Sequence, residues 1–337
     1  MTVRIGLVGL GYWGPNLARV FNELSDAELV ICCDLEETNL EKVAYLYPKI
    51  ETTHDVKILF EDGSLDAIVV ATSAATHYEL AKKALTQGKH VFIEKPLSLE
   101  YNQGQELVEI AERKNKVLMV GHLLEYHPAV NTIKNYLIDG LIGQVYYLYS
   151  QRLNLGKIRK DENCLWSLAP HDISAMLYLI ESEPTEVSAI GASYLRKGID
   201  DVVFVNLVFA NRIVANIHIS WLDPRKTRTL TIVGDDKMIV FDDMESSEKI
   251  RIYDRGVDIR PDYKAYGEDL TLRFGDIIIP SFQMKEPLKI ECRHFIDCIR
   301  ENKVPRSDGR DGLRVLKVLK AAQESIDKGG VPIKLKG

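Results

Sequence analysis

Cysteine is scarce in this chain. Its 337 residues include only five cysteines, an odd number, and no spacing among them matches a zinc site or a disulfide framework. Two adjacent cysteines fall in an apolar run that is typical of a buried strand. We therefore expect reduced and mostly buried thiols, no metal site and a cytoplasmic location. The five are Cys32, Cys33, Cys164, Cys292 and Cys298.

Positive charge and long apolar runs are also lacking. Lysine and arginine number 43 against 49 aspartate and glutamate residues, a formal net charge of −6, whereas a nucleic-acid-binding domain usually presents a basic face. No apolar run approaches the ~20 residues that span a bilayer. Gly6, Gly9 and Gly11 interrupt the first apolar segment, where a signal peptide would have its core. We expect no nucleic acid partner, no membrane span and no signal peptide.

The first 121 residues alternate strand-like and helix-like segments. The chain is 46% hydrophobic and 27% charged, and its length suits two domains. Strands that alternate with helices of ten or more residues indicate a parallel, doubly wound sheet. We predict an α/β domain of the Rossmann type over residues 1–121. Its expected strands are "VRIGLVG", "AELVICCD", "LDAIVVAT", "KHVFIEKP" and "VLMVGH".

From residue 122 onward the pattern changes to strands joined by short turns. Segments such as "EVSAIGASYL", "DDVVFVNLVFA" and "RIVANIHISWL" follow one another without helices between them. This pattern is typical of a large antiparallel sheet. We predict an α+β domain with a large open antiparallel sheet over residues 122–337, which binds substrate and forms oligomers. Its last helices can pack back on the first domain.

The segment "GLVGLGYWGPN" carries a G-x-G-x-x-G pattern between a strand and a helix. Gly9 permits a tight turn, Gly11 lets the backbone approach a pyrophosphate, and Gly14 lets the helix pack closely on the sheet. The N-terminus of the following helix offers N–H groups to phosphate. We predict a dinucleotide site that includes the loop residues Tyr12 and Trp13.

Asp34 selects between the two nicotinamide cofactors. It ends the second strand, 20 residues after Gly14. A carboxylate there accepts hydrogen bonds from ribose hydroxyls and repels a 2′-phosphate. The next residues, Leu35, Glu36 and Glu37, include no arginine that could neutralise such a phosphate. The sequence therefore favours NAD over NADP.

Polar residues follow the third and fourth strands, where ligands of such sheets bind. Thr72 and Ser73 can hydrogen-bond ribose or pyrophosphate, and His77 either does the same or only begins the next helix. In "EKP", both Glu94 and Lys95 are expected at the cofactor site. Lys95 either leads into a loop as a solvated lysine or binds a substrate hydroxyl, and it becomes a base if burial lowers its pKa.

Four segments together resemble the Gfo/Idh/MocA family of sugar and cyclitol oxidoreductases, over nearly the whole chain. They are "GLVGLGYWG", "ATSAATHYELAKKALTQGKHVFIEKPLSL", "GHLLEYHPAVNTIKNYLIDGLIGQV" and "APHDISAMLYL". The wording around "GYWGPN", "WSLAPHDIS" and "EPLKIEC" is similar to the UDP-N-acetylglucosamine 3-dehydrogenase type. The resemblance implies an NAD(P)-binding Rossmann domain and a second domain whose open sheet forms homodimers or homotetramers.

The resemblance also implies that Lys95 and His171 are catalytic. The family often has an aspartate four residues before this histidine, but this chain has Ser167 there. Asp172 can orient the imidazole, although adjacent helical residues point in different directions. We expect oxidation of a secondary alcohol on a sugar, with hydride leaving to NAD. His171 suits the base with its pKa near 6.5, and Lys95 the hydrogen-bond donor; the opposite assignment or a joint relay stays open.

The segment "QRLNLGKIRKDEN", residues 151–163, is rich in cations just before the histidine. Arg152, Lys157, Arg159 and Lys160 can hold the diphosphate of a nucleotide sugar or remain solvated. Trp166 lines the substrate pocket or packs in the core. We expect oxidation of the 3-hydroxyl of a UDP-N-acetylhexosamine. The alternatives are an inositol or free-sugar dehydrogenase, a keto-sugar reductase, and a non-catalytic dinucleotide sensor.

Overall fold

The computed structural model describes residues 2–156, 158–160, 162–259 and 270–335. It divides into two compact units: Met1–Tyr126 with Lys285–Lys317, and His127–Met284 with Val318–Gly337. The first boundary thus falls at residue 126, and the segment 285–317 is grouped with the N-terminal unit.

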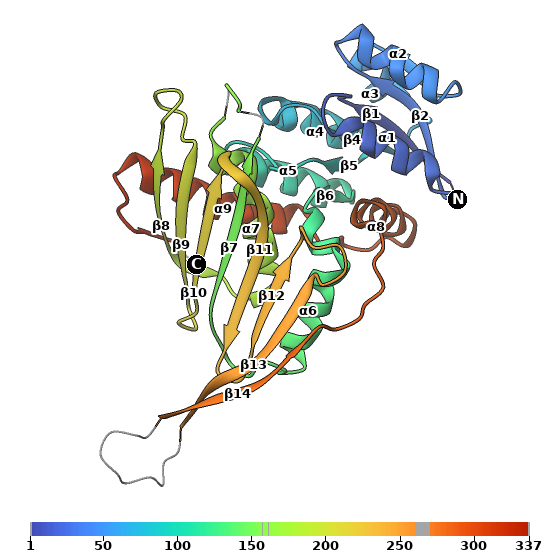
Figure 1. Ribbon diagram of the computed structural model, residues 1–337. Helices are drawn as coiled ribbons and strands as arrows, with labels where there is room; N and C mark the ends of the chain where they lie inside the picture. The colour runs from blue at the N-terminus through green and yellow to red at the C-terminus, as the bar shows by residue number, and fades with distance from the viewer. Residues whose placement is uncertain (1, 157, 161, 260–269, 336–337) are drawn as a thin grey trace. The chain divides into compact units, whose positions relative to one another are not determined.

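A six-stranded parallel sheet forms the centre of the first unit (Figure 1). The strand order is β3-β2-β1-β4-β5-β6, and the direction in which strands are added reverses between β1 and β4. The carboxyl ends of the strands at such a reversal are the usual ligand site. The predicted fold class is confirmed, with one strand that the sequence reading missed, β3. The strands are β1 Val3–Val8, β2 Ala27–Cys33, β3 Glu51–Thr53, β4 Ala67–Val70, β5 His90–Ile93 and β6 Leu118–Val120.

Helices cover both faces of this sheet. On one face Phe21, Phe92 and Phe295 pack edge to face, with ring centroids 5.7 to 6.4 Å apart. On the other face the apolar sides of α3, α4 and α5 pack on the sheet. The helices of this unit are α1 Gly14–Glu23, α2 Glu37–Leu46, α3 Val56–Glu61, α4 Ala74–Thr86, α5 Tyr101–Lys114, the 3₁₀ turn η1 Leu123–Tyr126 and α8 Pro287–Glu301. Helix α9, Gly309–Asp327, contributes residues 309–317.

The second unit is built on a nine-stranded sheet of order β14-β13-β12-β11-β7-β10-β9-β8-β15. Neighbours pair antiparallel as predicted, except β7 and β10, which are parallel. The sheet is therefore mixed. A helix and two strands lie between β7 and β10 in the sequence, and this long connection lets the two strands run in the same direction. The strands are β7 Val145–Leu155, β8 Pro184–Ala192, β9 Val202–Phe209, β10 Val214–Ser220, β11 Leu222–Gly234, β12 Met238–Asp242, β13 Ile250–Ile259, β14 Leu270–Ile278 and β15 Ile333–Lys334.

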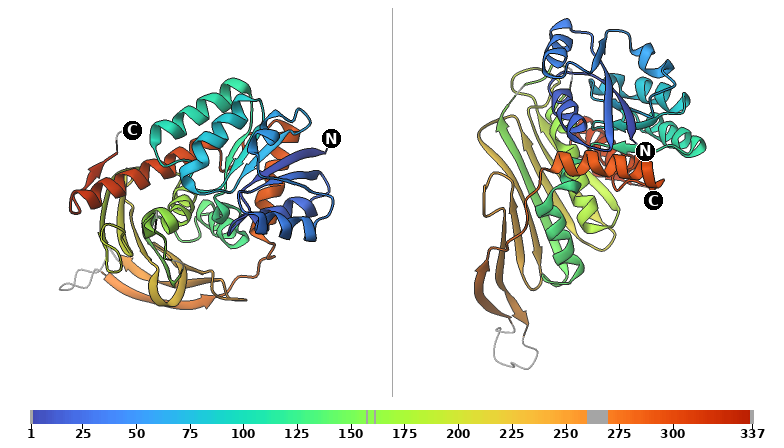
Figure 2. Two further views of the ribbon diagram at one scale, coloured as in Figure 1. Left: turned by 90° about the horizontal axis from the view of Figure 1, so that it is seen from above. Right: turned by 90° about the vertical axis from the view of Figure 1, so that its right-hand side faces the viewer.

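Two helices, α6 Pro128–Ile138 and α7 Cys164–Ile180, lie along one face of this sheet (Figure 2). Alternation along β9 gives each strand a covered and an open side: Val203 and Val205 are buried, whereas Phe204 between them is 44% exposed. Helices α6 and α7 therefore need an apolar stripe on the side that faces the sheet, not an apolar surface all round. Among the described residues, no helix combines the length and the apolar character that crossing a bilayer requires.

Candidate functional site

The three glycines of the first loop answer three different steric demands. Gly9 has φ +95°, and a Cβ on it would lie 2.7 Å from the backbone of Ala71 at the end of β4. A Cβ on Gly14 would lie 2.0 Å from the carbonyl oxygen of Gly9. Gly11 differs, because its Cβ position has no atom of the described chain within 4 Å. The fold requires Gly9 and Gly14, while Gly11 leaves room beside the backbone for a ligand.

Helix α1 begins directly behind this loop. Trp13 is its N-cap residue, and Pro15 lies in the first turn, where a missing N–H costs no helical hydrogen bond. Tyr12 is 82% exposed. The N–H groups of the first turn and their partial positive charge suit a phosphate at this end.

Asp34 is fixed by backbone hydrogen bonds at the end of β2. Leu10 N–H donates to Oδ2 at 2.5 Å and Glu36 N–H donates to Oδ1 at 2.8 Å, with the Asn39 amide 3.2 Å from Oδ1. The carboxylate is thus held beside the glycine loop, and its lone pairs can also accept ribose hydroxyls. A cavity adjoins Gly11 here, and Lys42 of helix α2 is among its lining residues. Lys42 is a cation that the sequence reading did not consider in weighing NAD against NADP.

The ends of β4 and β5 are tied together through a buried histidine. His77, in α4, places Nδ1 2.8 Å from the carbonyl oxygen of Pro96 and Nε2 3.2 Å from that of Thr72. Burial lowers the pKa of this ring, so a neutral imidazole donates to one of the two carbonyls. These contacts give His77 a role in joining two loops of the site. Ser73 is the exposed N-cap residue of α4.

Glu94 and Lys95 follow β5 at the same sheet edge. The Glu94 carboxyl lies against Gly121, and the nearby Trp13 side chain and Lys95 backbone favour its ionised form. Desolvation raises the pKa of Glu94 to about 7, against the opposing pull of the Lys95 and His122 charges. Lys95 is partly buried, and its peptide bond to Pro96 is cis. The candidate lysine therefore shares its site with a carboxyl that titrates near neutral pH.

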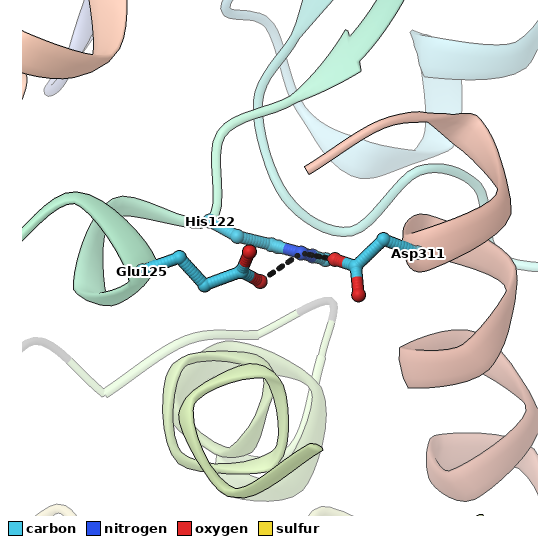
Figure 3. A group of neighbouring side chains, drawn as sticks. All are labelled: His122, Glu125 and Asp311. Carbon is cyan, nitrogen blue, oxygen red and sulfur yellow. Dashed lines mark hydrogen bonds and ion pairs between the residues drawn. The ribbon is translucent and has the colours of Figure 1, made fainter. Parts of the chain in front are cut away.

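Three buried polar side chains meet below this edge: His122, Glu125 and Asp311 (Figure 3). His122 Nδ1 lies 2.7 Å from Asp311 Oδ2 and 3.3 Å from Glu125 Oε1. Hydrogen bonds to these carboxylates raise the pKa of His122 to about 10 even though burial opposes its charge. Burial raises the pKa of Glu125 to about 7. An ion pair between the protonated His122 imidazole and the Asp311 carboxylate therefore explains why these polar groups can be buried together.

These three residues also form a possible metal-ligand set, which the sequence reading did not anticipate. Their candidate ligand atoms lie within 4.8 Å of one another. The short His122–Asp311 contact is already a charge-assisted hydrogen bond, so the pair is satisfied by a proton. No local sequence motif predicts this cluster, because Asp311 is 189 residues from His122 in the sequence.

In the second unit, helix α7 carries the histidine that the sequence singles out. His171 is partly buried and follows Pro170, which lies inside the helix. Its neighbour Asp172 accepts a hydrogen bond from Arg152 Nε of β7 at 2.5 Å. Both partners of this ion pair are largely buried. Asp172 and Arg152 therefore join helix α7 to the sheet, and Ser167 is buried one turn before His171.

The basic segment before α7 is shorter than predicted, because β7 extends to Leu155. Arg159 pairs with Glu162 at 2.8 Å, and Lys160 is exposed. Lys157 lies outside the described residues. Trp166 donates its indole N–H to Gln323 at 3.2 Å, so its polar edge is held within the second unit. Lys95 belongs to the first unit and His171 to the second.

Comparisons with known proteins agree with this arrangement. Residues 3–122 match a family model described as an oxidoreductase family with an NAD-binding Rossmann fold. Residues 130–240 match the model of the GFO/IDH/MocA C-terminal domain. Together the two models cover more than half of the chain.

Individual relatives differ in how much of the chain they match. A 2,7-anhydro-N-acetylneuraminate hydratase of Mediterraneibacter gnavus is 30% identical over 62% of this chain and 59% of its own length. An inositol 2-dehydrogenase of Salmonella paratyphi B is 28% identical over 54% of this chain and 56% of its own length. The chain thus spans about six tenths of the length of the first curated relatives.

Some relatives match nearly end to end. The UDP-N-acetylglucosamine 3-dehydrogenase of Acidithiobacillus ferrooxidans is 25% identical over 93% of this chain and 94% of its own length. Its solved structure superposes with a TM-score of 0.81, covering 97% of this chain and 98% of that one. With both domain models matched in order and the fold shared throughout, the chain belongs to the Gfo/Idh/MocA oxidoreductase family, and its first domain is an NAD-binding Rossmann fold.

Proposed function

We propose that this chain is an NAD-dependent dehydrogenase that oxidises a secondary hydroxyl on a sugar ring. The observation that carries the proposal is the position of Lys95, directly after β5, at the sheet edge that also bears the glycine loop and Asp34. The chain's residues fit the cofactor, because the open side of Gly11 leaves space for a pyrophosphate and Asp34 is held as an acceptor for ribose. Ligands of parallel sheets bind at this edge.

Each candidate side chain has a distinct task in this reaction. NAD, when bound, supplies the acceptor for the hydride. The Lys95 ammonium donates a hydrogen bond to the reacting oxygen and stabilises negative charge that develops there. The His171 imidazole takes the hydroxyl proton, because imidazole is the side chain whose unperturbed pKa lies closest to neutral pH. The reverse assignment requires the lysine pKa to fall from near 10.4 to close to neutrality.

For the substrate we propose a UDP-N-acetylhexosamine oxidised at its 3-hydroxyl. Support comes from the relative with that activity in its name, which aligns along almost the whole chain in sequence and structure. A second candidate is an inositol or free sugar, favoured by the relative from Salmonella paratyphi B, which aligns over about half of the chain. Reduction of a keto sugar uses the same groups in the opposite direction.

The deciding experiment follows NADH by its absorbance near 340 nm. Purified protein is mixed with NAD and with UDP-N-acetylglucosamine, UDP-N-acetylgalactosamine, inositols or free hexoses, each with and without 2-oxoglutarate. We expect NADH only with a UDP-sugar. NADH formed with an inositol or hexose instead would replace the substrate and keep the reaction class.

Two substitutions connect the activity to the site. Lys95→Ala and His171→Ala should each lower kcat by about 100-fold or more, the usual loss on removing a group that transfers or stabilises a proton. NADH binding should persist in both, because the glycine loop and Asp34 are intact. Firm NADH binding with no turnover of any substrate by the unaltered protein would instead favour a dinucleotide sensor.

A further inference from the structure

His77 is a buried histidine beside the carboxyl ends of β4 and β5. It lies in the first turn of α4 and is 1% exposed. Nδ1 lies 2.8 Å from the carbonyl oxygen of Pro96, and Nε2 lies 3.2 Å from that of Thr72. A ring buried to this extent leaves almost no surface for a ligand to touch, so it acts on the site through these two backbone partners.

The Thr72 carbonyl belongs to the turn that supports the glycine loop. A Cβ on Gly9 would lie 2.7 Å from the carbonyl of Ala71 and 2.8 Å from the backbone nitrogen of Thr72, so the glycine loop rests directly on this backbone. The turn has a second hold from α4, because the Thr76 hydroxyl donates to Thr72 Oγ1 at 2.8 Å. The turn after β4 is therefore fixed relative to both the helix and the glycine loop.

The Pro96 carbonyl belongs to the residue that directly follows the candidate lysine. Proline has no backbone N–H, so its carbonyl is the backbone group through which a hydrogen bond can fix it. Pro96 is buried, and a buried carbonyl that loses its donor costs free energy. The contact with His77 Nδ1 thus fixes the backbone next to Lys95.

The two distances assign the proton of the ring. Burial disfavours the charged form of an imidazole, and both partners of His77 are uncharged carbonyl groups. A neutral imidazole carries one N–H, and the contact of 2.8 Å is the shorter of the two and close to the usual hydrogen-bond length. The proton therefore lies on Nδ1, which donates to Pro96, while Nε2 meets Thr72 by packing.

We propose that His77 is a positioning residue whose Nδ1–H fixes Lys95, through Pro96, against the turn that supports the glycine loop. A displacement of about 1 Å at a reacting group can cost about 100-fold in rate. NADH affinity depends less on this hydrogen bond, because the glycine loop and Asp34 are intact without it and Thr76 still holds the turn. The effect on turnover rests on the proposed function, whereas the effect on the backbone does not.

Two amide side chains separate the two nitrogens of the ring. Asparagine places its amide nitrogen about where Nδ1 lies, so His77→Asn keeps a donor for Pro96. Glutamine extends to about the position of Nε2, so His77→Gln loses that donor. We expect His77→Gln to lower kcat about ten-fold or more, with a Kd for NADH within about three-fold of the unaltered protein. His77→Asn should recover most of the rate.

Hydrogen–deuterium exchange tests the backbone without any substrate. In His77→Gln the amides of residues 94–98 should exchange about five-fold faster or more, the effect of one lost hydrogen bond, whereas His77→Asn should keep the original rate. His90→Gln is the matched control, because His90 Nδ1 accepts the N–H of Val117 at 3.0 Å at the opposite end of β5. It should lower the Tm without changing kcat or the exchange of residues 94–98.

Thermal unfolding confirms that each variant is folded at the assay temperature. An unchanged kcat in His77→Gln, or equal losses of kcat in the glutamine and asparagine variants, would overturn the proposal. So would exchange that rises equally throughout the parallel sheet. If the unaltered protein turns over no sugar, the proposed function fails, and the exchange of residues 94–98 then decides the role of His77.

Discussion

At the residue scale, we expect the buried pair of His122 and Asp311 to contribute strongly to the free energy of unfolding. Both side chains are almost fully buried, and their contact of 2.7 Å joins the end of β6 to the first turn of α9. Removing one member of such a pair leaves an uncompensated charge in the interior, which costs about 3–5 kcal/mol. Replacing both members costs less than the sum of the two single changes.

His122→Gln and Asp311→Asn should therefore each destabilise the protein by about 3 kcal/mol or more, and the double variant by clearly less than their sum. The pH dependence has a definite sign. The folded pKa of His122, about 10, lies above its unfolded value near 6.5, so the pair's contribution is complete below about pH 6.5 and is lost toward pH 10. Denaturant unfolding of the four proteins between pH 6 and 10 measures both effects, and additive single losses would refute the coupling.

Asp34 supplies a second residue-level prediction. Its carboxylate is held by the backbone N–H groups of Leu10 and Glu36, and Lys42 lines the neighbouring cavity. In Asp34→Ala the acceptor for ribose and the repulsion of a 2′-phosphate are both lost. NADH should bind about ten-fold more weakly, while the ratio of NADPH to NADH affinity rises, as isothermal titration with both cofactors can show.

Lys42→Met in the same background is the control for that experiment. If Lys42 receives the phosphate in the Asp34→Ala variant, adding Lys42→Met should reverse the gain in relative NADPH affinity. An unchanged cofactor ratio in Asp34→Ala would show that discrimination lies elsewhere.

At the element scale, the glycine loop separates the needs of the fold from those of the ligand. Gly14→Ala would place a methyl group 2.0 Å from the Gly9 carbonyl, so helix α1 must shift, and we expect a lowered Tm and lost NADH binding. Gly11→Ala meets no atom within 4 Å and should keep the Tm within a few degrees, yet weaken NADH binding by about ten-fold or more. Differential scanning fluorimetry and NADH titration of the pair test this, and equal Tm losses would contradict it.

The same element shows how much the sequence predicts. Local spacing indicates strand, glycine turn and helix in order, because each glycine serves a neighbour within a few residues or the adjacent strand end. The parallel sheet follows from the alternation of strands and helices. These features depend on the spacing of residues that are close together in the chain, so a single sequence is enough to predict them.

Contacts between distant segments escaped the same reasoning. Asp311 meets His122 from 189 residues away, and nothing near either residue signals the other. Arg152 was expected to hold a diphosphate or to remain solvated, but it lies in β7 and donates a hydrogen bond to Asp172. The parallel pairing of β7 and β10 was hidden in a run of strands that looked uniformly antiparallel. Tertiary pairing, rather than local preference, decides such positions.

At the scale of the whole molecule, the open face of the nine-stranded sheet predicts self-association. Across the sheet, Ile190 pairs with Phe204 and Phe204 with His218, forming a largely uncharged row, and Ile190 is 64% exposed. Tyr147 and Tyr149 stack on the same face of β7. Exposed apolar side chains that gather on one face often mark an interaction surface. We propose that a second copy of the chain covers it, giving a homodimer or homotetramer.

Light scattering coupled to size-exclusion chromatography measures this directly. The unaltered chain should elute as a dimer or tetramer, and Phe204→Glu should shift it toward the monomer by placing an unpaired charge in the interface. Glu61→Gln, at an exposed position of α3 in the first unit, removes a charge far from this face in the sequence and should leave the mass unaltered. A monomeric unaltered chain would refute the proposal.

The grouping of α8 with the first unit has a consequence for biosynthesis. Phe295 of that helix completes the aromatic cluster with Phe21 and Phe92, so one apolar face of the sheet made by the first 126 residues is only partly covered until residue 295 has been synthesised. The domain that begins the chain is thus among the last parts to finish folding. A nascent fragment that ends at Tyr126 should bind chaperones through its exposed apolar face. Most of the second unit is synthesised before helix α8 becomes available to complete the first unit.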